Sequence, residues 1–383
     1  MRSLARSLFQ LLGRFGQMPR RLASLSRKIF GEITVDRIGS IELVPASLVR
    51  VNSHTSGFEQ ERYKWPVDTI HTPFDSERRF LQGAFCYACV TQAVIAGDGR
   101  VFDSDGRFVR DSAASHIAKV INPGPLKPKV SRSVDGPVLN LNWWSGSENI
   151  FHWNRDVLSR AFVLRHLERN SITLLVPETC AEYQTHAVHQ LRRAFPACRV
   201  EPLAFGEWVR VEECLVPSQA PYYIGSGYLH SEVASFVREV NIAGIATNGA
   251  TIPVAYVTRA NSKHRRIRNE EKLLESLREV VDIEVLSLES YSYKEQMSLM
   301  QRVDVLVGVF GAGLTHAYFT RGGGLIEVHN GDSRETHFLT LALSMGIPYE
   351  QVIGGPSDVH QDFEIDESTC LATVTALRRM TSL

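Results

Sequence analysis

The feature that most constrains the fold is a regular alternation of strand and helix patterns in the C-terminal half of the chain. Short apolar runs of strand-like composition occupy residues 254–257, 283–288, 303–308, 325–328 and 349–353. Helical patterns separate them at residues 270–281, 292–302, 311–319 and 334–345. Strands and helices in this order form a parallel sheet with crossover helices. The pattern therefore predicts a doubly wound, Rossmann-like domain over residues 250–365.

Residues 31–235 give a second and less regular pattern. Strand-like runs flank the turn Gly97-Asp98-Gly99, which is typical of a β-hairpin. Strand and helix patterns alternate again from residue 138 to residue 195, so we expect a second α/β domain, with a cleft between it and the C-terminal domain. Ligands in such folds bind beyond the carboxyl ends of the strands. The last helix, within residues 366–383, is expected to pack back on this first domain.

Residues 1–30 contain seven basic residues and no acidic one. At 100° per residue the apolar side chains fall mostly on one face and the arginines on the opposite face, which predicts a basic amphipathic helix. Such a helix suits an anionic membrane surface. A helix packed on the body, a disordered tail and an organellar transit peptide are the alternatives that the segment leaves open.

The charge of the remaining chain excludes one class of partner. Lys and Arg together number 42, as do Asp and Glu, so the body without its first 30 residues is mildly acidic. A dedicated nucleic-acid binder needs a basic face, and no nucleic-acid partner is expected. No run of 18 apolar residues predicts a transmembrane helix, and no apolar stretch of the kind found in signal peptides is present.

A glycine-rich turn follows the most apolar strand pattern of the chain. Residues 303–309 run into Phe310-Gly311-Ala312-Gly313, after which a helix is predicted to begin. Glycines let the backbone approach a ligand closely, and the amides at a helix start favour a phosphate. The turn is not a Walker A loop, because no Gly-Lys-Ser/Thr follows it. A tight strand-to-helix turn without a ligand is the alternative.

Basic residues are predicted to lie on the same edge of the sheet as this turn. Arg259 ends the first strand of the domain, and Arg265 and Arg266 precede its first helix. Guanidinium groups bind phosphate through paired hydrogen bonds, so the three arginines are candidates to hold a diphosphate. Glu270 is expected either to orient one of them or to favour the helix N-terminus. A solvated loop remains the alternative for the cluster.

Three further sets of residues are candidates for chemistry. His152 and Asp156 are four residues apart and project from one helix face, either as a catalytic pair or as a surface pair. Glu327 lies in an apolar strand, so it contacts a sugar hydroxyl or forms a structural ion pair. Glu182, His186 and His189 have metal-like spacing but lie opposite the apolar side of their helix, where a solvated face is expected. Neither a metal site nor another cofactor is expected.

These motifs together resemble glycosyltransferase family 61, which includes plant xylan arabinosyl- and xylosyltransferases, animal O-linked N-acetylglucosamine transferases and bacterial capsule proteins. The family pattern has a strand-end Arg, then Arg-Arg-Ile-x-Asn-Glu, Glu-Gln in a helix, Val-Gly-x-His-Gly-Ala-Gly-Leu-Thr-Asn and a later Glu. The matching positions here are Arg259, residues 265–270, Glu295-Gln296, residues 307–316 and Glu327, with a first-half match at residues 149–160. The resemblance covers about residues 85–355.

The resemblance implies a GT-B architecture, with two Rossmann-like domains facing across a cleft, and inverting transfer from a nucleotide sugar, usually a UDP-sugar. We expect Asp156 to act as the base or as the group that orients the base, with His152 as its partner. The residues that we expect to bind the donor are Arg259, Arg265, Arg266, Glu270, Gly311, Ala312, Gly313, Leu314, Thr315 and Glu327. The family has His at the position of Phe310 and Asn at that of His316, so either the role of that histidine is lost here or His316 supplies it from one turn on.

The expected function is therefore sugar transfer to a glycan or lipid-linked acceptor in surface or capsular polysaccharide synthesis. The expected location is the cytoplasm, peripheral to the inner face of the plasma membrane through residues 1–30. Two other classes remain open: a catalytically impaired nucleotide-sugar-binding scaffold, which the replacement by Phe310 favours, and another group transferase on a GT-B-like fold, such as a pyruvyl transferase.

Deletion of residues 1–30 should release the protein from anionic lipid vesicles, because the segment carries seven basic residues and an apolar face, with four of its arginines opposite that face. Co-sedimentation of the full-length and truncated chains with vesicles of anionic lipid measures this. Undiminished sedimentation of the truncated chain would refute membrane binding by the segment.

Overall fold

The computed structural model describes residues 32–33, 39–44, 47–50, 79–82, 85–112, 129–142, 149–167, 171–218, 229–332 and 336–381. The predicted amphipathic helix of residues 1–30 lies outside them. No helix among the described residues is both long enough and apolar enough to span a membrane.

The C-terminal sheet is parallel throughout, as the alternating pattern predicts. Its five strands are ordered β13-β12-β14-β15-β16. The strands are β12 (Ile252–Val257), β13 (Ile283–Leu286), β14 (Val303–Val309), β15 (Gly324–His329) and β16 (Tyr349–Ile353). The intervening helices are α8 (Glu270–Arg278), α9 (Tyr293–Met300), a 3₁₀ helix (Ala312–Phe319) and α10 (His337–Met345), and α11 (Glu367–Thr381) is the last described helix.

Helices cover both faces of this sheet, which explains why its strands are apolar in succession. Val254, Val305 and Ile326 pack with α8 and α11 on one face. Ala255 and Leu306 pack on the other face, with α9, α10 and the 3₁₀ helix. The predicted capping box of α9 is confirmed, because the Glu295 carboxylate accepts from the Ser292 amide at 2.8 Å.

The N-terminal sheet is mixed rather than wholly parallel. Its order is β1-β7-β6-β5-β11-β8-β9-β10, with β2 beside β5. Its strands are β1 (Glu32–Ile33), β2 (Ser40–Val44), β5 (Phe85–Ala96), β6 (Val101–Phe102), β7 (Phe108–Val109), β8 (Arg132–Asn140), β9 (Ile172–Pro177), β10 (Cys198–Leu203) and β11 (Trp208–Pro217). Strands β8 to β11 are parallel where they pair, but β5 runs antiparallel to β11 and β6. The predicted β-hairpin at Gly97–Gly99 is thereby confirmed, and β3 (Ser47–Arg50) pairs separately with β4 (Arg79–Gln82).

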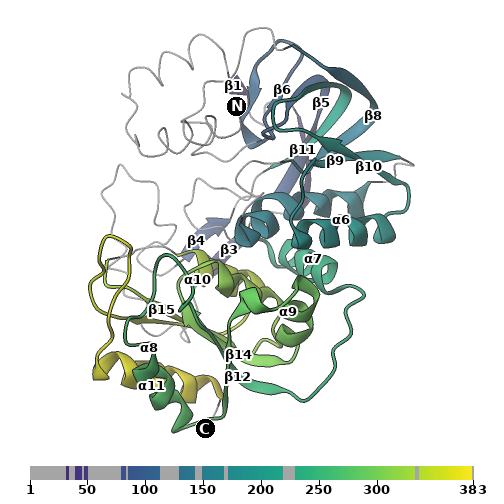
Figure 1. The fold of residues 1–383 in the computed structure, drawn as a ribbon. Coiled ribbons are helices and arrows are strands. Elements are labelled where there is room, and N and C mark those ends of the chain that lie inside the picture. The colour runs from purple at the N-terminus through teal and green to yellow at the C-terminus, as the bar shows by residue number, and fades with distance from the viewer. Residues whose placement is uncertain are drawn as a thin grey trace.

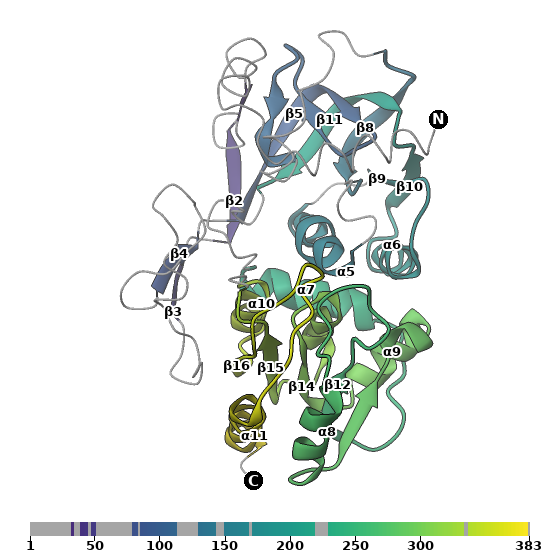
Figure 2. The same cartoon turned by 60° about the vertical axis from the view of Figure 1, so that its left-hand side comes forward.

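Three helical segments lie between the two sheets (Figures 1 and 2). The first starts as α5 (Ile150–His152), passes through a π-helical turn (Trp153–Val157) and ends as a 3₁₀ helix (Leu158–His166). The others are α6 (Glu182–Ala194) and α7 (Ser231–Ile242). One apolar core runs from Leu139 through Phe162 and Phe236 to Leu306, so both sheets share it.

Asn241 on α7 joins four elements inside this core. Its side-chain nitrogen donates to Asn154 at 2.9 Å, and its side-chain oxygen accepts from the Tyr293 hydroxyl on α9. Its backbone oxygen accepts from His186 Nε2 on α6 at 2.8 Å. Asn241 is fully buried, and Arg238 one turn earlier donates to two carbonyl groups at the end of the 3₁₀ helix Ala312–Phe319. Helix α7 therefore fixes the two sheets relative to each other.

Two expectations are wrong. His186 is buried rather than solvated, because α7 covers the side of α6 that the sequence assigns to solvent. On the same helix, Glu182 accepts from the Tyr293 amide at 3.0 Å. The final helix, α11, packs against α8, β15 and β16 through Cys370, Val374 and Leu377, and so completes the C-terminal sheet instead of returning to the first domain.

Replacing Asn241 with Ala should lower the free energy of unfolding by about 2–4 kcal/mol, because Asn154 and Tyr293 lose buried partners. Tyr293→Phe removes only one of these hydrogen bonds and should cost about 1 kcal/mol. Urea denaturation followed by circular dichroism measures both. Equal unfolding free energies for Asn241→Ala and the wild type would contradict the role of α7 as the joint.

Candidate functional site

The C-terminal sheet has its topological switch point between β12 and β14. The chain goes from β12 to β13 on one side and then crosses to β14 on the other. In open α/β sheets the helices on the two sides of such a point diverge, and ligands bind at the carboxyl ends of the two strands. Arg259 follows β12 and Gly311 follows β14, so both predicted residues lie at this point.

Arg259 and Gly311 are in direct contact. A Cβ atom built on Gly311 would lie 2.2 Å from Nη1 of Arg259, so only glycine allows the guanidinium to take this position. Nη2 of Arg259 donates to the His264 carbonyl at 2.9 Å, whereas its buried Nε has no hydrogen-bond partner among the described residues. Burial and the nearby charge of Arg265 lower the pKa of Arg259. An anion bound here would accept a hydrogen bond from the unpaired Nε and would offset the repulsion between the two guanidinium groups.

The residues after Gly311 form the predicted helix start, but as a 3₁₀ helix. Leu314 donates from its amide to the Gly311 carbonyl at 2.9 Å, and a Cβ atom on Gly313 would touch Val257 at 3.0 Å. Thr315 is fully buried, and its hydroxyl has no partner among the described residues. Ala312 begins this helix and is half-buried. The backbone amides of the turn therefore lie beside Arg259.

His316 points into the protein rather than toward Phe310. Its Nδ1 lies 2.9 Å from the Gly313 carbonyl and its Nε2 2.8 Å from Oε1 of Gln296. Burial lowers the pKa of His316 to about 4, so the ring is neutral near pH 7. These contacts give His316 a role in holding the turn, and they do not favour it as a replacement for the family histidine.

Arg265 and Arg266 have different surroundings. The guanidinium carbon of Arg265 lies 4.7 Å from the centre of the Phe310 ring, in a cation–π contact. Arg266 instead pairs with the buried Asp362, at 2.6 Å from Nη2 and 2.9 Å from Nε. Of the two neighbours, Arg265 is placed beside the Gly311 turn and Arg266 holds the loop in place.

The two predicted glutamates have internal partners. Glu270 at the start of α8 accepts from Tyr256 at 2.8 Å and Thr258 at 2.6 Å, so it ties the helix to the end of β12. Glu327 in β15 is fully buried, accepts from the Tyr349 hydroxyl and lies 3.4 Å from His329 Nε2. For Glu327 the geometry favours the structural pair over the contact with a sugar.

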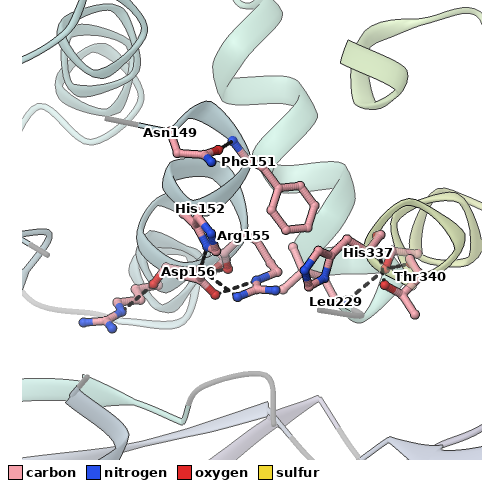
Figure 3. Close-up of polar contacts among 11 residues, drawn as sticks. Asn149, Phe151, His152, Arg155, Asp156, Leu229, His337 and Thr340 are labelled. Atoms are coloured by element: carbon pink, nitrogen blue, oxygen red, sulfur yellow. Dashed lines mark hydrogen bonds and ion pairs between the residues drawn. The ribbon is translucent and has the colours of Figure 1, made fainter. Parts of the chain in front are cut away.

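On the N-terminal side, Asp156 is the centre of a charged group. It accepts from Arg155 through both oxygens, at 2.6 and 2.8 Å, and lies 2.8 Å from Nδ1 of His152 (Figure 3). Arg155 and Asp156 are adjacent in the π-helical turn, and the Arg155 side chain reaches the carboxylate of its neighbour. Burial raises the pKa of Asp156, but the charge of Arg155 and the bond from His152 outweigh it, so the pKa lies below its ordinary value. Asp156 is therefore an ionised carboxylate suited to orienting His152.

His337 at the start of α10 links this group to the Phe310 side. Its ring centre lies 5.3 Å from that of Phe151 and 6.3 Å from that of Phe310. In Figure 3 the Arg155 side chain lies between Asp156 and His337. Burial and the charge of Arg155 lower the pKa of His337 to about 3. The rings of Phe151, His337 and Phe310 thus lie in succession between the Asp156 group and the Gly311 turn.

Sequence reasoning missed Arg155, Phe151, His337 and Tyr318 as members of the site. The charges of Arg155 and Asp156 both act on the buried Tyr318, whose pKa burial raises. The position of Phe151 in the motif around His152 was the one sequence signal that could have identified it. His337 lies almost 200 residues away and belongs to no motif. In the described residues no group of His, Cys, Asp and Glu is arranged to hold a metal ion.

Residues 150–326 match the sequence model of a family described as Glycosyltransferase 61. This match confirms the resemblance drawn from the motifs. It covers the helix 150–166, α6, α7 and the sheet edge that carries Arg259 and Gly311.

Individual relatives are similar over shorter stretches. The EGF domain-specific O-linked N-acetylglucosamine transferase of Bos taurus is 32% identical over 120 residues, which is 30% of this chain and 22% of the relative. The protein of the same name in Gallus gallus is 29% identical over 131 residues, 33% of this chain and 24% of the relative. The Drosophila melanogaster one is 34% identical over 70 residues, 18% of this chain and 13% of the relative. The chain thus spans less than a quarter of the length of these relatives.

Replacing His337 with Phe should flatten the pH dependence of stability between about pH 6.5 and pH 4. The folded state keeps His337 neutral down to a pKa of about 3, whereas the unfolded chain takes up a proton near 6.5, so wild-type stability falls as the pH falls. One such proton amounts to about 1.4 kcal/mol per pH unit. Urea unfolding at several pH values measures the slope.

The exposed His166 provides the control, because His166→Phe should leave the wild-type slope in place. The absolute cost of packing Phe at position 337 is the same at every pH and does not alter the slope. An unchanged slope in His337→Phe would contradict a neutral, buried His337.

Proposed function

We propose that the chain, whose residues 150–326 match the glycosyltransferase 61 family, transfers a sugar from a nucleotide-sugar donor to a glycan acceptor. The observation that carries the proposal is the contact between Arg259 and Gly311 at the switch point, with Arg265 beside it. Two guanidinium groups and the amides of a glycine turn at one sheet edge suit two linked phosphoryl groups.

The donor side stabilises the leaving group in this scheme. When the bond between the anomeric carbon and the diphosphate breaks, negative charge develops on the departing oxygen. The guanidinium groups of Arg259 and Arg265 stabilise that negative charge, and the amides of residues 311–313 donate hydrogen bonds to the phosphate oxygens. The His264 carbonyl holds the guanidinium of Arg259, for which Gly311 leaves room, and the Phe310 ring holds that of Arg265.

The acceptor side removes a proton. The acceptor hydroxyl attacks the anomeric carbon from the face opposite the diphosphate, and its proton passes to His152 Nε2. Asp156 accepts the Nδ1 hydrogen of His152 and stabilises the imidazolium that forms. A single displacement of this kind inverts the configuration at the anomeric carbon.

The finer parts of the proposal rest on the sequence. A UDP-sugar donor, a GT-B arrangement with a cleft between two domains, and a role in surface or capsular polysaccharide synthesis follow from the resemblance to the family. Binding of a lipid-linked acceptor at the inner face of the plasma membrane follows from the basic character of residues 1–30. The curated relatives support transfer of N-acetylglucosamine as the first donor sugar to test.

Two variants separate donor binding from turnover. Gly311→Ala places a methyl group 2.2 Å from Nη1 of Arg259, so the guanidinium must move and the affinity for UDP should fall about tenfold or more. Asp156→Asn should keep the affinity for UDP and lose about 100-fold or more in turnover, because His152 loses the carboxylate that orients it. Thermal shift across a panel of nucleotides, followed by transfer and hydrolysis assays on the sugars that bind, measures both.

Gly206→Ala is the control for Gly311→Ala, because no atom lies within 4 Å of a Cβ atom at that position. Thermal stabilisation by UDP without transfer or hydrolysis would indicate a binding scaffold instead of a transferase. The replacement of the family histidine by Phe310 favours this alternative. No response to any nucleoside diphosphate would exclude the donor site and leave a different group transferase. Full turnover in Asp156→Asn would remove Asp156 from the mechanism.

A further inference from the structure

Residues 354–366, here called the strap, cross the loop that carries the arginine cluster. Residues 266–268 pair with Phe363, which is buried, and the Asn269 side chain exchanges two hydrogen bonds with the backbone of Ile365, at 2.8 and 3.0 Å. The ion pair between Arg266 and Asp362 belongs to the same connection. The strap therefore fixes the backbone of residues 265–269, which include three of the arginines.

The strap contacts Arg265 at one side chain, Gln361. Nε of Arg265 donates to Oε1 of Gln361 at 2.7 Å, and the Arg265 amide donates to the His360 carbonyl at 3.1 Å. Both Arg265 and Gln361 have positive φ angles, 62° and 61°. Among the described residues the only other non-glycine residue with a positive φ angle is Gln92. Two residues in an unfavourable conformation thus face each other and share a hydrogen bond.

Such conformations persist where the surrounding structure enforces them, and they are concentrated at ligand sites. Here the constrained backbone sets the position of the Arg265 guanidinium. Arg265 lies over the Phe310 ring, and its charge acts on Arg259, whose guanidinium lies against Gly311. The strap holds a second cation near the first, although the two repel each other. A ligand with two adjacent anionic groups compensates that repulsion.

We propose that Gln361 is a positioning residue that fixes Arg265 for the second phosphoryl group of a nucleoside diphosphate. Arg259 and the amides of residues 311–313 hold the first phosphoryl group. The strap thereby makes the site selective for diphosphates over monophosphates. This inference rests on the proposed function, because it assumes that the switch point holds the donor.

The test compares the affinities of the full chain for UDP and UMP by isothermal titration calorimetry. Gln361→Gly removes the contact to Arg265 and relieves the positive φ angle, so its melting temperature should not fall. Its Kd for UDP should rise about fivefold or more, as expected for a lost hydrogen bond to a charged group, while its Kd for UMP stays unchanged. Gln361→Asn tolerates the same backbone angle but is one methylene too short, and it should behave alike.

Arg268→Gln is the matched control. It breaks the ion pair between Arg268 and Asp358, another contact between loop and strap, without touching Arg265, so the ratio of the two affinities should stay that of the wild type. An unchanged ratio in both Gln361 variants would overturn the inference while leaving the donor site intact. Equal losses for UDP and UMP would make Gln361 a purely structural residue and also overturn it. No binding of UDP by the wild-type chain would overturn the donor assignment itself.

Discussion

The hydrogen bonds of the buried Asn241 determine how the two sheets lie relative to each other, and the candidate site depends on that arrangement. His152 and Asp156 belong to a helix beneath the N-terminal sheet, whereas Arg259 and Gly311 belong to the C-terminal sheet. Helix α7 contacts both sides, and the rings of Phe151, His337 and Phe310 lie in succession between them. A small rotation about α7 would separate the proposed base from the proposed phosphate site.

The C-terminal half was predictable because its sequence pattern is governed by local rules. Strands buried on both faces read as apolar runs, and the capping box at Ser292 marks a helix start without reference to the rest of the fold. The N-terminal sheet follows a less local logic, since β5 pairs with β11 across more than 100 residues. Only a contact of that range joins the local hairpin of β5 and β6 to the parallel strands in one mixed sheet.

The roles of single residues were harder to predict for the same reason. Arg265 and Arg266 are neighbours in one basic cluster, and nothing nearby in sequence distinguishes them. Asp362 and Gln361, almost 100 residues later, decide that Arg266 forms an ion pair with a buried carboxylate and that Arg265 lies over Phe310. Glu327 was ambiguous until Tyr349 and His329 provided its partners. A motif therefore located the site, and distant residues determined what each member does.

The shared core limits how the chain can be divided or recombined. Leu139, Phe236 and Leu306 belong to one uninterrupted apolar interior that crosses from one sheet to the other through α7. Cutting the chain after α7 would expose apolar surface on both fragments, so neither half is expected to fold on its own. Recombination between related proteins is expected to preserve function only when α6, α7 and α9 are exchanged together.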